Sequence, residues 1–416
     1  MSQMIPVSEA IAIVERETRS LGSESVRLAE SVGRILVRDI IADTDLPPFD
    51  RSQMDGFALR ATDTEGAPCE LAIVGESAAG RGWKGTIKSG EVVRIMTGAP
   101  VPAGADAVQK LELTEENFAL LQRTLQPDEA SEATGTVRIL EAVEKGKFIV
   151  AKGAEINKGE QVFASSEAIT PQMIASLAAF GYSEVKVGQK PRVAVLATGS
   201  EIVNIAETPG PDQIRNSNSP MLTALACRLG GEAHELPLVA DDLEALNLAI
   251  AEAAYKSDIV VITGGVSVGK YDLTKDALRN LGAEIFFERV KLKPGKPTVF
   301  ARLGEALIFG LPGNPVSAAV TFHLFVRLAM LRMQGATGAT LRSGFATVEK
   351  KLKGAEERDT FLPAVAATND RGRMIATAVK WFGSSDFVGF ARANSLIFVP
   401  AGKVFDPGDV VEVFFL

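Results

Sequence analysis

The sequence predicts a multidomain protein in which a central α/β domain is combined with two regions that are rich in β-strands. Short apolar runs separated by glycine and proline turns fill residues 57–145. Buried strands alternate with helices over residues 190–333, and strands with turn residues resume near Ala336 and continue to the end. A length of 416 residues is sufficient for several domains.

The N-terminal half is predicted to begin with a helix over residues 7–19, where apolar residues recur at helical spacing and Ser8 is a suitable cap. A second short helix is expected over residues 27–32, followed by extended chain up to Pro47–Pro48. After the strand-rich stretch, residues 170–182 are predicted to form a helix that has Pro171 at its first position. This half therefore reads as helical segments on both sides of a β-rich insert.

The central region is predicted to be a doubly wound, mostly parallel sheet with helices on both faces, because strands and helices of matching length alternate. Residues 192–203 are expected to be a buried strand that leads into a turn, residues 258–265 another buried strand, residues 306–313 a strand, and residues 314–333 a long apolar helix. Residues 285–297 are expected to form one strand. The last region, from about Ala336, is expected to be a small all-β module.

Composition excludes several functional classes. A net charge of −8 argues against a nucleic-acid or membrane-surface binder, and no apolar run approaches the length of a membrane span. Charges interrupt the apolar stretch at the N-terminus, so no targeting peptide is expected there. Two cysteines and two histidines, without ligand spacing, predict neither a zinc site nor disulfides and favour a reducing cytoplasm. Carboxylates, lysines, hydroxyls and backbone amides must then carry the chemistry.

Polar and glycine-rich loops follow three predicted strands of the α/β region. Ligands of open α/β sheets bind outside the carboxyl ends of the strands, and glycines allow backbone amides to approach them. Each loop taken alone could be an ordinary turn, but three at one edge favour a binding site. The candidate residues at this edge are Glu201, Asn218, Ser219, Gly264, Gly265, Ser267, Asp272, Gly313, Asn314 and Ser317.

Three lysines, Lys291, Lys293 and Lys296, are concentrated around a Pro294–Gly295 turn in this acidic chain. Lys291 and Lys293 are two residues apart on the expected strand, so they should project from the same face. Together the ammonium groups predict a site for a ligand with several negative charges, such as a phosphate ester. The alternative is an edge strand that lysines protect from aggregation, but the turn adds nothing to such protection.

A second polar cluster lies in the N-terminal half. Asp50 and Asp55 could provide oxygen ligands for Mg²⁺ or a hydrogen-bonding base, and Thr97–Gly98–Ala99 offers a hydroxyl and backbone amides in a rigid turn. Loops held by their own Asx-turns are an equally good interpretation of these residues.

Taken in order, these motifs resemble the molybdopterin molybdenumtransferase family, which includes bacterial MoeA and the E domain of gephyrin. The resemblance covers nearly the whole chain. The matching segments are PPFDRSQMDGFALR, RIMTGAPVPAGADAV, ATGSEIV, IRNSNSPML, VITGGVSVGKYDLTKDAL, VKLKPGKPTVFA, IFGLPGNPVSAAVTF and FGSSDFVGFARANSLIFVP.

The resemblance implies a subunit of four parts. Residues 1–45 and 146–180 would form a discontinuous, extended N-terminal domain, and residues 46–145 its β-rich insert. Residues 181–334 would form a three-layer α/β domain of the molybdopterin-binding type, and residues 335–416 a C-terminal β-barrel.

It also implies a cytoplasmic, Mg²⁺-dependent transferase of molybdenum cofactor biosynthesis. The family inserts molybdate into adenylylated molybdopterin and releases AMP. Its members are homodimers whose active cleft combines the α/β domain of one subunit with the N-terminal domains of the other. Contacts with the molybdopterin adenylyltransferase and with proteins that deliver the cofactor to molybdoenzymes are expected, and contacts with nucleic acid or membrane are not.

Residue roles follow from the same resemblance. The strand-end loops and Pro294 would cradle the pterin and its phosphates, while Lys291, Lys293 and Lys296 would neutralise the charge of phosphate and molybdate. Asp55 and Thr97 of the partner subunit would complete the pocket. Asp272, Glu201 and either Asp241 or Asp242 would hold Mg²⁺ or hydrogen-bond the pterin. The predicted catalytic residues are Asp55, Thr97, Asp272, Lys293 and Lys296, and the predicted metal ligands are Asp241, Asp242 and Asp272.

The N-terminal half departs from the family pattern. Members often carry Asn-x-Arg and Gly-Glu-Asp where this chain has Phe148, Val150 and Gly153–Ala154–Glu155, and Arg51, Gln53 and Phe57 are also unusual. These changes raise the alternative of an altered paralogue that binds molybdopterin or the finished cofactor for delivery or scaffolding. A nicotinamide oxidoreductase is disfavoured, because GxGxxG does not follow the first α/β strand.

Overall fold

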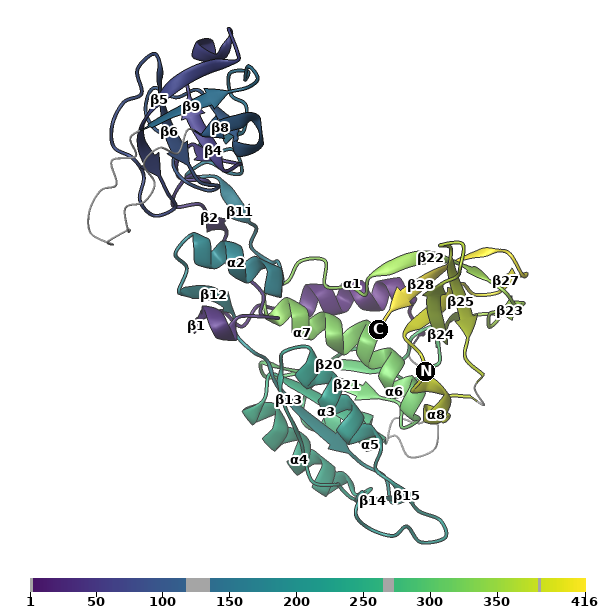
Figure 1. Cartoon of the computed structure of the whole chain (residues 1–416). Helices are drawn as coiled ribbons and strands as arrows, with labels where there is room; N and C mark the ends of the chain where they lie inside the picture. Colours follow the sequence, from purple (N-terminus) through teal and green to yellow (C-terminus); the bar gives the residue numbers. More distant parts are fainter. Residues whose placement is uncertain (1–2, 117–134, 265–272, 381–382) are drawn as a thin grey trace. The chain divides into compact units, whose positions relative to one another are not determined.

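The computed structural model describes residues 3–116, 135–264, 273–380 and 383–416 (Figure 1). Its contacts divide the chain into two units. The first comprises Met1–Arg38, Ser165–Ala175 and Tyr182–Leu416, and the second comprises Asp39–Ala164 and Ser176–Gly181. Of the predicted site residues, Gly265, Ser267 and Asp272 lie outside the described residues.

A six-stranded sheet forms the centre of the first unit. Its order is β16-β13-β17-β21-β20-β18, with β16, β13, β17 and β21 parallel and the last two strands antiparallel. The mostly parallel sheet that the alternating sequence predicts is thereby confirmed. The strands are β13 (Arg192–Ala197), β16 (Glu232–Glu235), β17 (Ile259–Thr263), β18 (Glu284–Phe287), β20 (Val299–Leu303) and β21 (Ala306–Leu311).

Helices cover both faces of this sheet, because neighbouring strand residues point to opposite sides. Val193 and Val195 belong to one apolar core, whereas Ala194 and Leu196 belong to another. The first core includes α1 (Val7–Glu17), α3 (Asn218–Arg228) and the helical segment after β21, and Figure 1 shows α1 beside α7 (Arg327–Met333). The second includes α4 (Leu243–Lys256) and α5 (Leu273–Asn280), which completes a three-layer domain.

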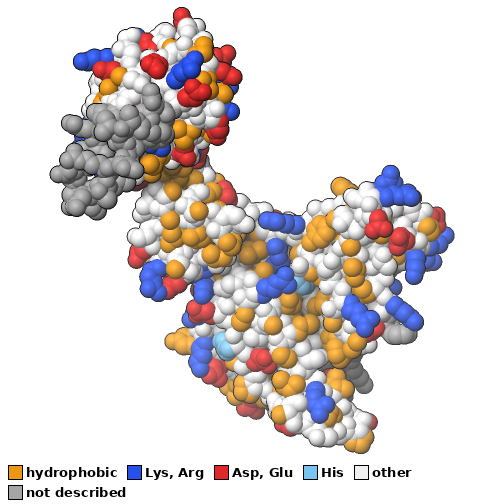
Figure 2. All heavy atoms as spheres, in the orientation of Figure 1, with side chains coloured by type: hydrophobic (Ala, Val, Ile, Leu, Met, Phe, Trp, Pro, Cys, Tyr) orange, Lys and Arg blue, Asp and Glu red, His pale blue; other side chains and the backbone are white. Residues whose placement is uncertain are grey.

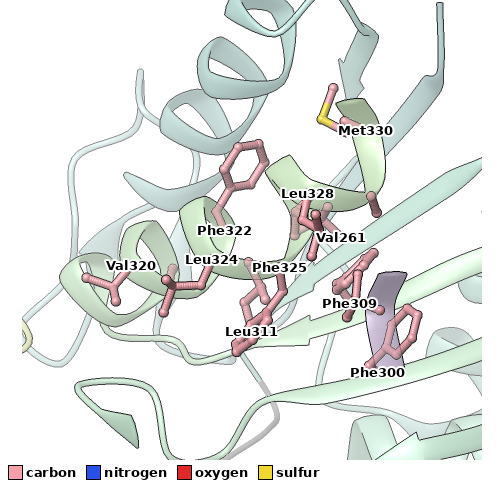
Figure 3. Packing of buried hydrophobic residues seen from close by; sticks show 14 of the residues in the cluster. Val261, Phe300, Phe309, Leu311, Val320, Phe322, Leu324, Phe325, Leu328 and Met330 are labelled. Carbon is pink, nitrogen blue, oxygen red and sulfur yellow. The ribbon is translucent and has the colours of Figure 1, made fainter. Parts of the chain in front are cut away.

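The long apolar helix is the principal core element. It consists of α6 (Pro315–Thr321), a π-helical segment η4 (Phe322–Val326) and α7. Phe325 and Leu328 point toward the strands of the sheet in Figure 3, whereas Phe322 points away from them. The rings of Phe300 and Phe309 stack 4.8 Å apart. Among the described residues this is the one helix long and apolar enough to cross a membrane, and 83% of its apolar window is buried inside the protein.

We expect the protein to lose stability in acid because His323, on this helix, is buried. Burial, with the charges of Arg327 and Arg228, lowers the pKa of its side chain from 6.5 to about 4. Between these two pKa values the unfolded chain binds more protons than the folded chain. The free energy of unfolding therefore decreases as the pH falls from 6.5 to 4, by about 3 kcal/mol in total.

Denaturant titrations at pH 7 and pH 4.5 would measure this effect. A His323→Gln variant is expected to lose less stability between the two pH values than the wild type. A His234→Gln variant is the matched control, because His234 is exposed. Equal pH dependence of all three proteins would contradict the assignment to His323.

The C-terminal part of the first unit is a closed five-stranded barrel, as expected. Its sheet runs β24-β25-β22-β28-β26, and β24–β26 pairing closes it. The strands are β22 (Ser343–Val348), β24 (Asp359–Thr368), β25 (Met374–Ala378), β26 (Ser395–Val399) and β28 (Val410–Phe415). Two short strands, β23 (Leu352–Lys353) and β27 (Val404–Phe405), pair beside it, and a short helix α8 (Phe387–Phe390) precedes β26.

The prediction of a single strand over residues 285–297 is wrong. Strand β18 ends at Phe287 in the α/β sheet, and the next strand, β19 (Leu292–Lys293), pairs with β24 of the barrel. The backbone of Lys291 is held on both sides, since its amide donates to Ile5 and its carbonyl accepts from Asp359. The lysine-rich segment therefore connects two domains and is not the end of a strand in the central sheet.

The predicted helix over residues 27–32 is also wrong. A strand, β1 (Ser23–Arg27), pairs antiparallel with β12 (Glu184–Gly188), and only one 3₁₀ turn follows at Leu28–Glu30. The pairing supplies backbone hydrogen bonds that a six-residue helix could not match. Helix α1 begins at Val7, so Ser8 lies inside it, whereas α2 (Pro171–Ala179) starts at Pro171 as predicted.

The second unit contains the predicted β-rich insert. Its six-stranded sheet has the order β7-β4-β6-β5-β9-β8, and Phe57 and Leu59 are among its fully buried residues. Two-stranded pairs join β2 (Ile40–Ile41) to β11 (Gln161–Phe163) and β3 (Arg51–Ser52) to β10 (Ile149–Val150). The sheet strands are β4 (Gly56–Leu59), β5 (Cys69–Ser77), β6 (Glu91–Ile95), β7 (Ala107–Lys110), β8 (Thr114–Glu116) and β9 (Gly135–Ile139).

Candidate functional site

Asn218 joins the loops at the carboxyl edge of the α/β sheet. It begins α3, is buried, and its Nδ2 donates to Thr263 Oγ1 at 2.8 Å and to the carbonyl of Gly313 at 2.7 Å. Thr263 ends β17 and Gly313 follows β21. The Asn218 Oδ1 atom is buried without a hydrogen-bond partner in the part of the chain that the structure describes. One amide thus connects three of the predicted loops and keeps an acceptor free.

Gly264 allows two of these loops to approach closely. Its φ is +93°, and a Cβ at this position would lie 2.0 Å from the carbonyl oxygen of Thr198. A Cβ on Gly313 would lie 3.6 Å from the Gly264 Cα. A side chain at Gly264 would be strained and would push apart the ends of β13 and β17. Gly264 is therefore required for the shape of this edge, whereas a Cβ at Gly313 would make only an ordinary van der Waals contact.

The carboxylates predicted to bind a metal are engaged in local hydrogen bonds. Asp241 accepts from Thr198 Oγ1 and from the backbone amide of Ser200, both at 2.9 Å. Asp242 caps α4 by accepting from the amide of Ala245 at 2.8 Å. Glu201 is exposed. Within the described residues no group of three or more His, Cys, Asp or Glu side chains could hold a metal ion. This part of the protein offers no preformed magnesium cage.

Ser219 is committed to a local structure as well. Its hydroxyl accepts from Asn216 Nδ2 at 2.9 Å, and its amide donates to Asn216 Oδ1 at 3.1 Å. This reciprocal pair fixes the start of α3. Ser219 therefore positions Asn218, and its hydroxyl is buried inside the turn.

A cleft of about 510 Å³ lies where the lysine-rich segment meets the start of α6. It brings together Lys293, Lys296 and Arg358. No carboxylate of the described chain lies within ion-pair distance of these three cations, although acidic and basic side chains are mixed over the face shown in Figure 2. The remaining lining residues are Pro294, Gly295, Pro297, Pro312, Asn314, Ser317, Gly383 and Ser384. The cleft is therefore positively charged and suited to an anion.

Local packing fixes the two lysines of the cleft. Gly295 has a φ of +121°, and a Cβ there would lie 2.6 Å from Thr321 Cγ2, so only glycine allows the turn to lie against α6. The carbonyl of Lys296 accepts from the amide of Val290 at 3.0 Å. Lys291 is exposed but is not part of the cleft lining. The cleft unites two of the three predicted lysines with Asn314 and Ser317.

The barrel contributes residues that the sequence-based prediction omitted. Ser384 accepts from Asn314 Nδ2 at 2.9 Å through its hydroxyl and from the amide of Val316 at 3.0 Å through its carbonyl. Arg358 immediately precedes β24. Ser384 belongs to the FGSSD motif, whose sequence alone indicates no role for it, whereas no motif marks Arg358 in the run KGAEERDTF.

The polar cluster of the second unit forms between two adjacent strands. Asp55 precedes β4 and Thr97 follows β6, and these strands pair so that Gly56 lies opposite Ile95. Asp55 Oδ1 accepts from the amide of Thr97 at 2.6 Å. Hydrogen bonds from Thr97, and to a smaller extent the charge of Arg94, lower the pKa of Asp55. Asp55 is thus an exposed carboxylate that stays ionised at neutral pH.

The residues that depart from the family pattern lie near one another in this unit. Arg51 Nη2 lies 3.2 Å from Glu155 Oε1, in an ion pair that is exposed on both sides. The carbonyl of Phe148, which has a φ of +55°, accepts from the amide of Gln53 at 2.9 Å. Glu155 is the carboxylate that could replace the acidic residues of the family's Gly-Glu-Asp run, and it is already paired with Arg51.

Comparison with known sequences identifies the chain along its whole length. The MoeA N-terminal region (domain I and II) matches residues 5–181, the probable molybdopterin binding domain residues 194–332, and the MoeA C-terminal region (domain IV) residues 346–416. A molybdopterin molybdenumtransferase of Staphylococcus aureus is 36% identical over 98% of this chain and 95% of its own length. The chain belongs to the molybdopterin molybdenumtransferase family.

Solved structures of the family agree with this assignment. A molybdopterin biosynthesis MoeA protein from Pyrococcus horikosii is 32% identical with a TM-score of 0.79, and it covers 99% of both chains. A second structure, from Pyrococcus horikoshii OT3, is 28% identical with a TM-score of 0.83 over the full length of both. The molybdopterin molybdenumtransferase of Staphylococcus epidermidis is 34% identical over 98% of this chain and 95% of its own.

Proposed function

We propose that this chain is a molybdopterin molybdenumtransferase that inserts molybdate into adenylylated molybdopterin and releases AMP. The observation that carries the proposal is the cleft at the edge of the α/β sheet, with three cations that no described carboxylate neutralises. The nucleotide substrate carries a diphosphate, and molybdate is itself an oxyanion. Both therefore need positive charge and hydrogen-bond donors, which this cleft provides.

The residues of the cleft receive roles by their chemistry. Lys293, Lys296 and Arg358 would neutralise the phosphates and the incoming molybdate. Gly264 and Gly313 leave backbone close to the ligand, and the free Oδ1 of Asn218 would accept a hydrogen bond from the pterin. Ser317 and Asn314, with Pro294 and Lys291 nearby, would shape the phosphate end. The remaining proposed contacts come from Glu201, Gly265, Ser267 and Asp272, and Ser219 would contribute by positioning Asn218.

Magnesium is part of the proposal as an ion held largely by substrate oxygens. Mg²⁺ commonly binds through one or two carboxylates together with phosphates, and it would supply positive charge to the diphosphate. Asp241, Asp242 and Asp272 remain the proposed carboxylates. Asp241 and Asp242 already accept the local hydrogen bonds described above. Each carboxylate has further lone pairs with which it could bind Mg²⁺.

We further propose a homodimer in the cytoplasm whose active cleft is shared between subunits. Asp55 and Thr97 of one subunit would then face the lysines of the other, which explains why polar clusters occur in two separate units. The ionised Asp55 would orient or accept a proton from a donor group of the substrate. The proposed partners are the molybdopterin adenylyltransferase, which would supply the substrate, and proteins that deliver the product to molybdoenzymes.

Release of AMP tests this function directly. Purified protein with Mg²⁺, molybdate and adenylylated molybdopterin is expected to release AMP, and omission of molybdate is expected to lower the yield. The readout is AMP formed per chain, and substrate binding is measured on the same sample. Background AMP from a chain with substrate verifiably bound would contradict turnover.

A binding-only paralogue is the second candidate, and one observation favours it. Glu155, the carboxylate that could replace a family acidic residue, is engaged by Arg51. This candidate predicts normal pterin affinity without rescue of a strain that lacks the insertase. Restoration of a molybdoenzyme's activity in that strain would eliminate it.

A further inference from the structure

A second pocket of about 250 Å³ includes residues of η4 and α7 and shares no lining residue with the cleft. It is formed by the last turn of α3, the π-helical segment η4, the first residue of α7 and the end of β28. Its polar groups come from Arg228, His323, Arg327 and Arg342. Neither the family comparison nor the proposed reaction gives this pocket a role.

The arginines of the pocket, Arg228, Arg327 and Arg342, form no ion pair with an Asp or Glu side chain of the described chain, and Leu416, the last residue of the sequence, lines the pocket beside them. Arg327 Nη1 donates to the carbonyl of Ala339 at 2.6 Å, which orients the guanidinium. Burial and the charge of Arg342 lower the pKa of Arg327, and the charges of Arg327 and Arg228 add to the effect of burial on His323.

His323 supplies a second, independent indication of a ligand. Its side chain is only 8% exposed, and its Nδ1 has no hydrogen-bond partner among the described residues. A buried nitrogen of this kind costs free energy unless something satisfies it. It belongs to the π-helical segment, a helix irregularity that is often found at functional sites.

We propose that this pocket binds a small tetrahedral oxyanion of the phosphate, sulfate or molybdate class, held by Arg228, Arg327 and Arg342 with a hydrogen bond from His323 Nδ1–H. The volume admits such an ion with a few waters but is below that of pockets for drug-sized ligands, so a pterin nucleotide does not fit. The ion would neutralise the arginines and satisfy the histidine. It would also connect α3 and α7 to the end of the barrel.

Histidine NMR can test this site separately from the cleft. The chain has two histidines, His234 and His323, so ¹³C-labelled histidine gives two resonances that His234→Gln assigns. The titration uses the Lys293→Ala/Lys296→Ala chain, in which anion binding at the cleft is weakened. Phosphate, sulfate and molybdate are each added against chloride at equal ionic strength. The His323 resonance is expected to shift saturably while that of His234 stays in place.

Two single variants identify the arginines. Arg228→Gln and Arg342→Gln are each expected to weaken the apparent affinity by about ten- to a hundredfold, the range for one charged hydrogen bond. Arg371→Gln, an exposed arginine in the turn before β25, is the matched control and should leave affinity unchanged. Thermal denaturation verifies that each variant folds.

Two outcomes would overturn the proposal. One is a His323 resonance that responds equally to chloride and to all three oxyanions. The other is an affinity that Arg371→Gln lowers as much as the pocket variants do, since that would indicate nonspecific ion binding. The first outcome is measured on a chain that keeps all the arginines of the pocket, so it remains informative even if an arginine variant fails to fold.

Discussion

Replacement of Lys293 and Lys296 together by alanine is expected to lower kcat/KM for AMP release by at least about a hundredfold. Each ammonium that contacts a phosphate contributes on the order of 1.5–3 kcal/mol, and a factor of ten corresponds to about 1.4 kcal/mol. Neither side chain forms an ion pair with a described residue, so their removal breaks no such contact in the fold. The melting temperature should therefore change little while substrate affinity falls.

The matched control is Lys350→Ala/Lys353→Ala. These lysines have the same spacing, are exposed, and lie outside the cleft lining in the same unit. Steady-state AMP release, substrate affinity and thermal denaturation are measured on both double variants. A large loss of melting temperature with unchanged affinity in the Lys293/Lys296 variant would favour the interpretation of these lysines as edge protection.

Mixed dimers are expected to recover activity that each parent variant lacks. Asp55→Asn keeps the size of the side chain but removes the charge that the Thr97 amide stabilises, so a chain with this change should be nearly inactive. In a dimer with a Lys293→Ala/Lys296→Ala chain, one of the two shared clefts has an intact Asp55 and intact lysines. Such heterodimers should show about half of the wild-type activity, and a statistical mixture about a quarter.

Co-expression with two different affinity tags would isolate the heterodimers for this measurement. The control pairs Asp55→Asn with Lys350→Ala/Lys353→Ala. One of its two clefts is intact and the other lacks only Asp55, so it should also reach about half of the wild-type activity. Verified heterodimers of the first kind that stay inactive, beside an active control, would show that Asp55 and the lysines serve the same subunit.

Local patterns in the sequence were sufficient for the elements of the α/β domain. Alternation of buried strands and helices predicted the layers, and glycine-rich loops after β13, β17 and β21 marked the edge that Asn218 joins. These features can be predicted locally because the pattern of apolar residues in a strand, and the position of a glycine in a turn, are visible in a short window of sequence. The start of α2 at Pro171 was predicted for the same reason.

The partner of the lysine-rich segment could not be predicted in this way. An extended run of residues has the same alternation whichever sheet it joins, and hydrogen bonding to β24 assigned Leu292–Lys293 to the barrel. Pairing also determined the structure of residues 23–27. They form strand β1 because they pair with β12, which lies more than 150 residues later in the sequence. The free energy of both pairings comes from backbone groups distant in sequence, which a local pattern does not contain.

The sequence by itself determined the fold class, the family and most residues at the edge of the sheet. Only the tertiary structure brought Arg358 and Ser384 of the barrel to the cleft and showed that Asp241 and Asp242 serve local hydrogen bonds. It alone gathered Arg228, His323 and Arg342 around one pocket. The reason is physical: residue type and local spacing are written in the chain, whereas charge density and unpaired buried atoms arise when distant segments pack together.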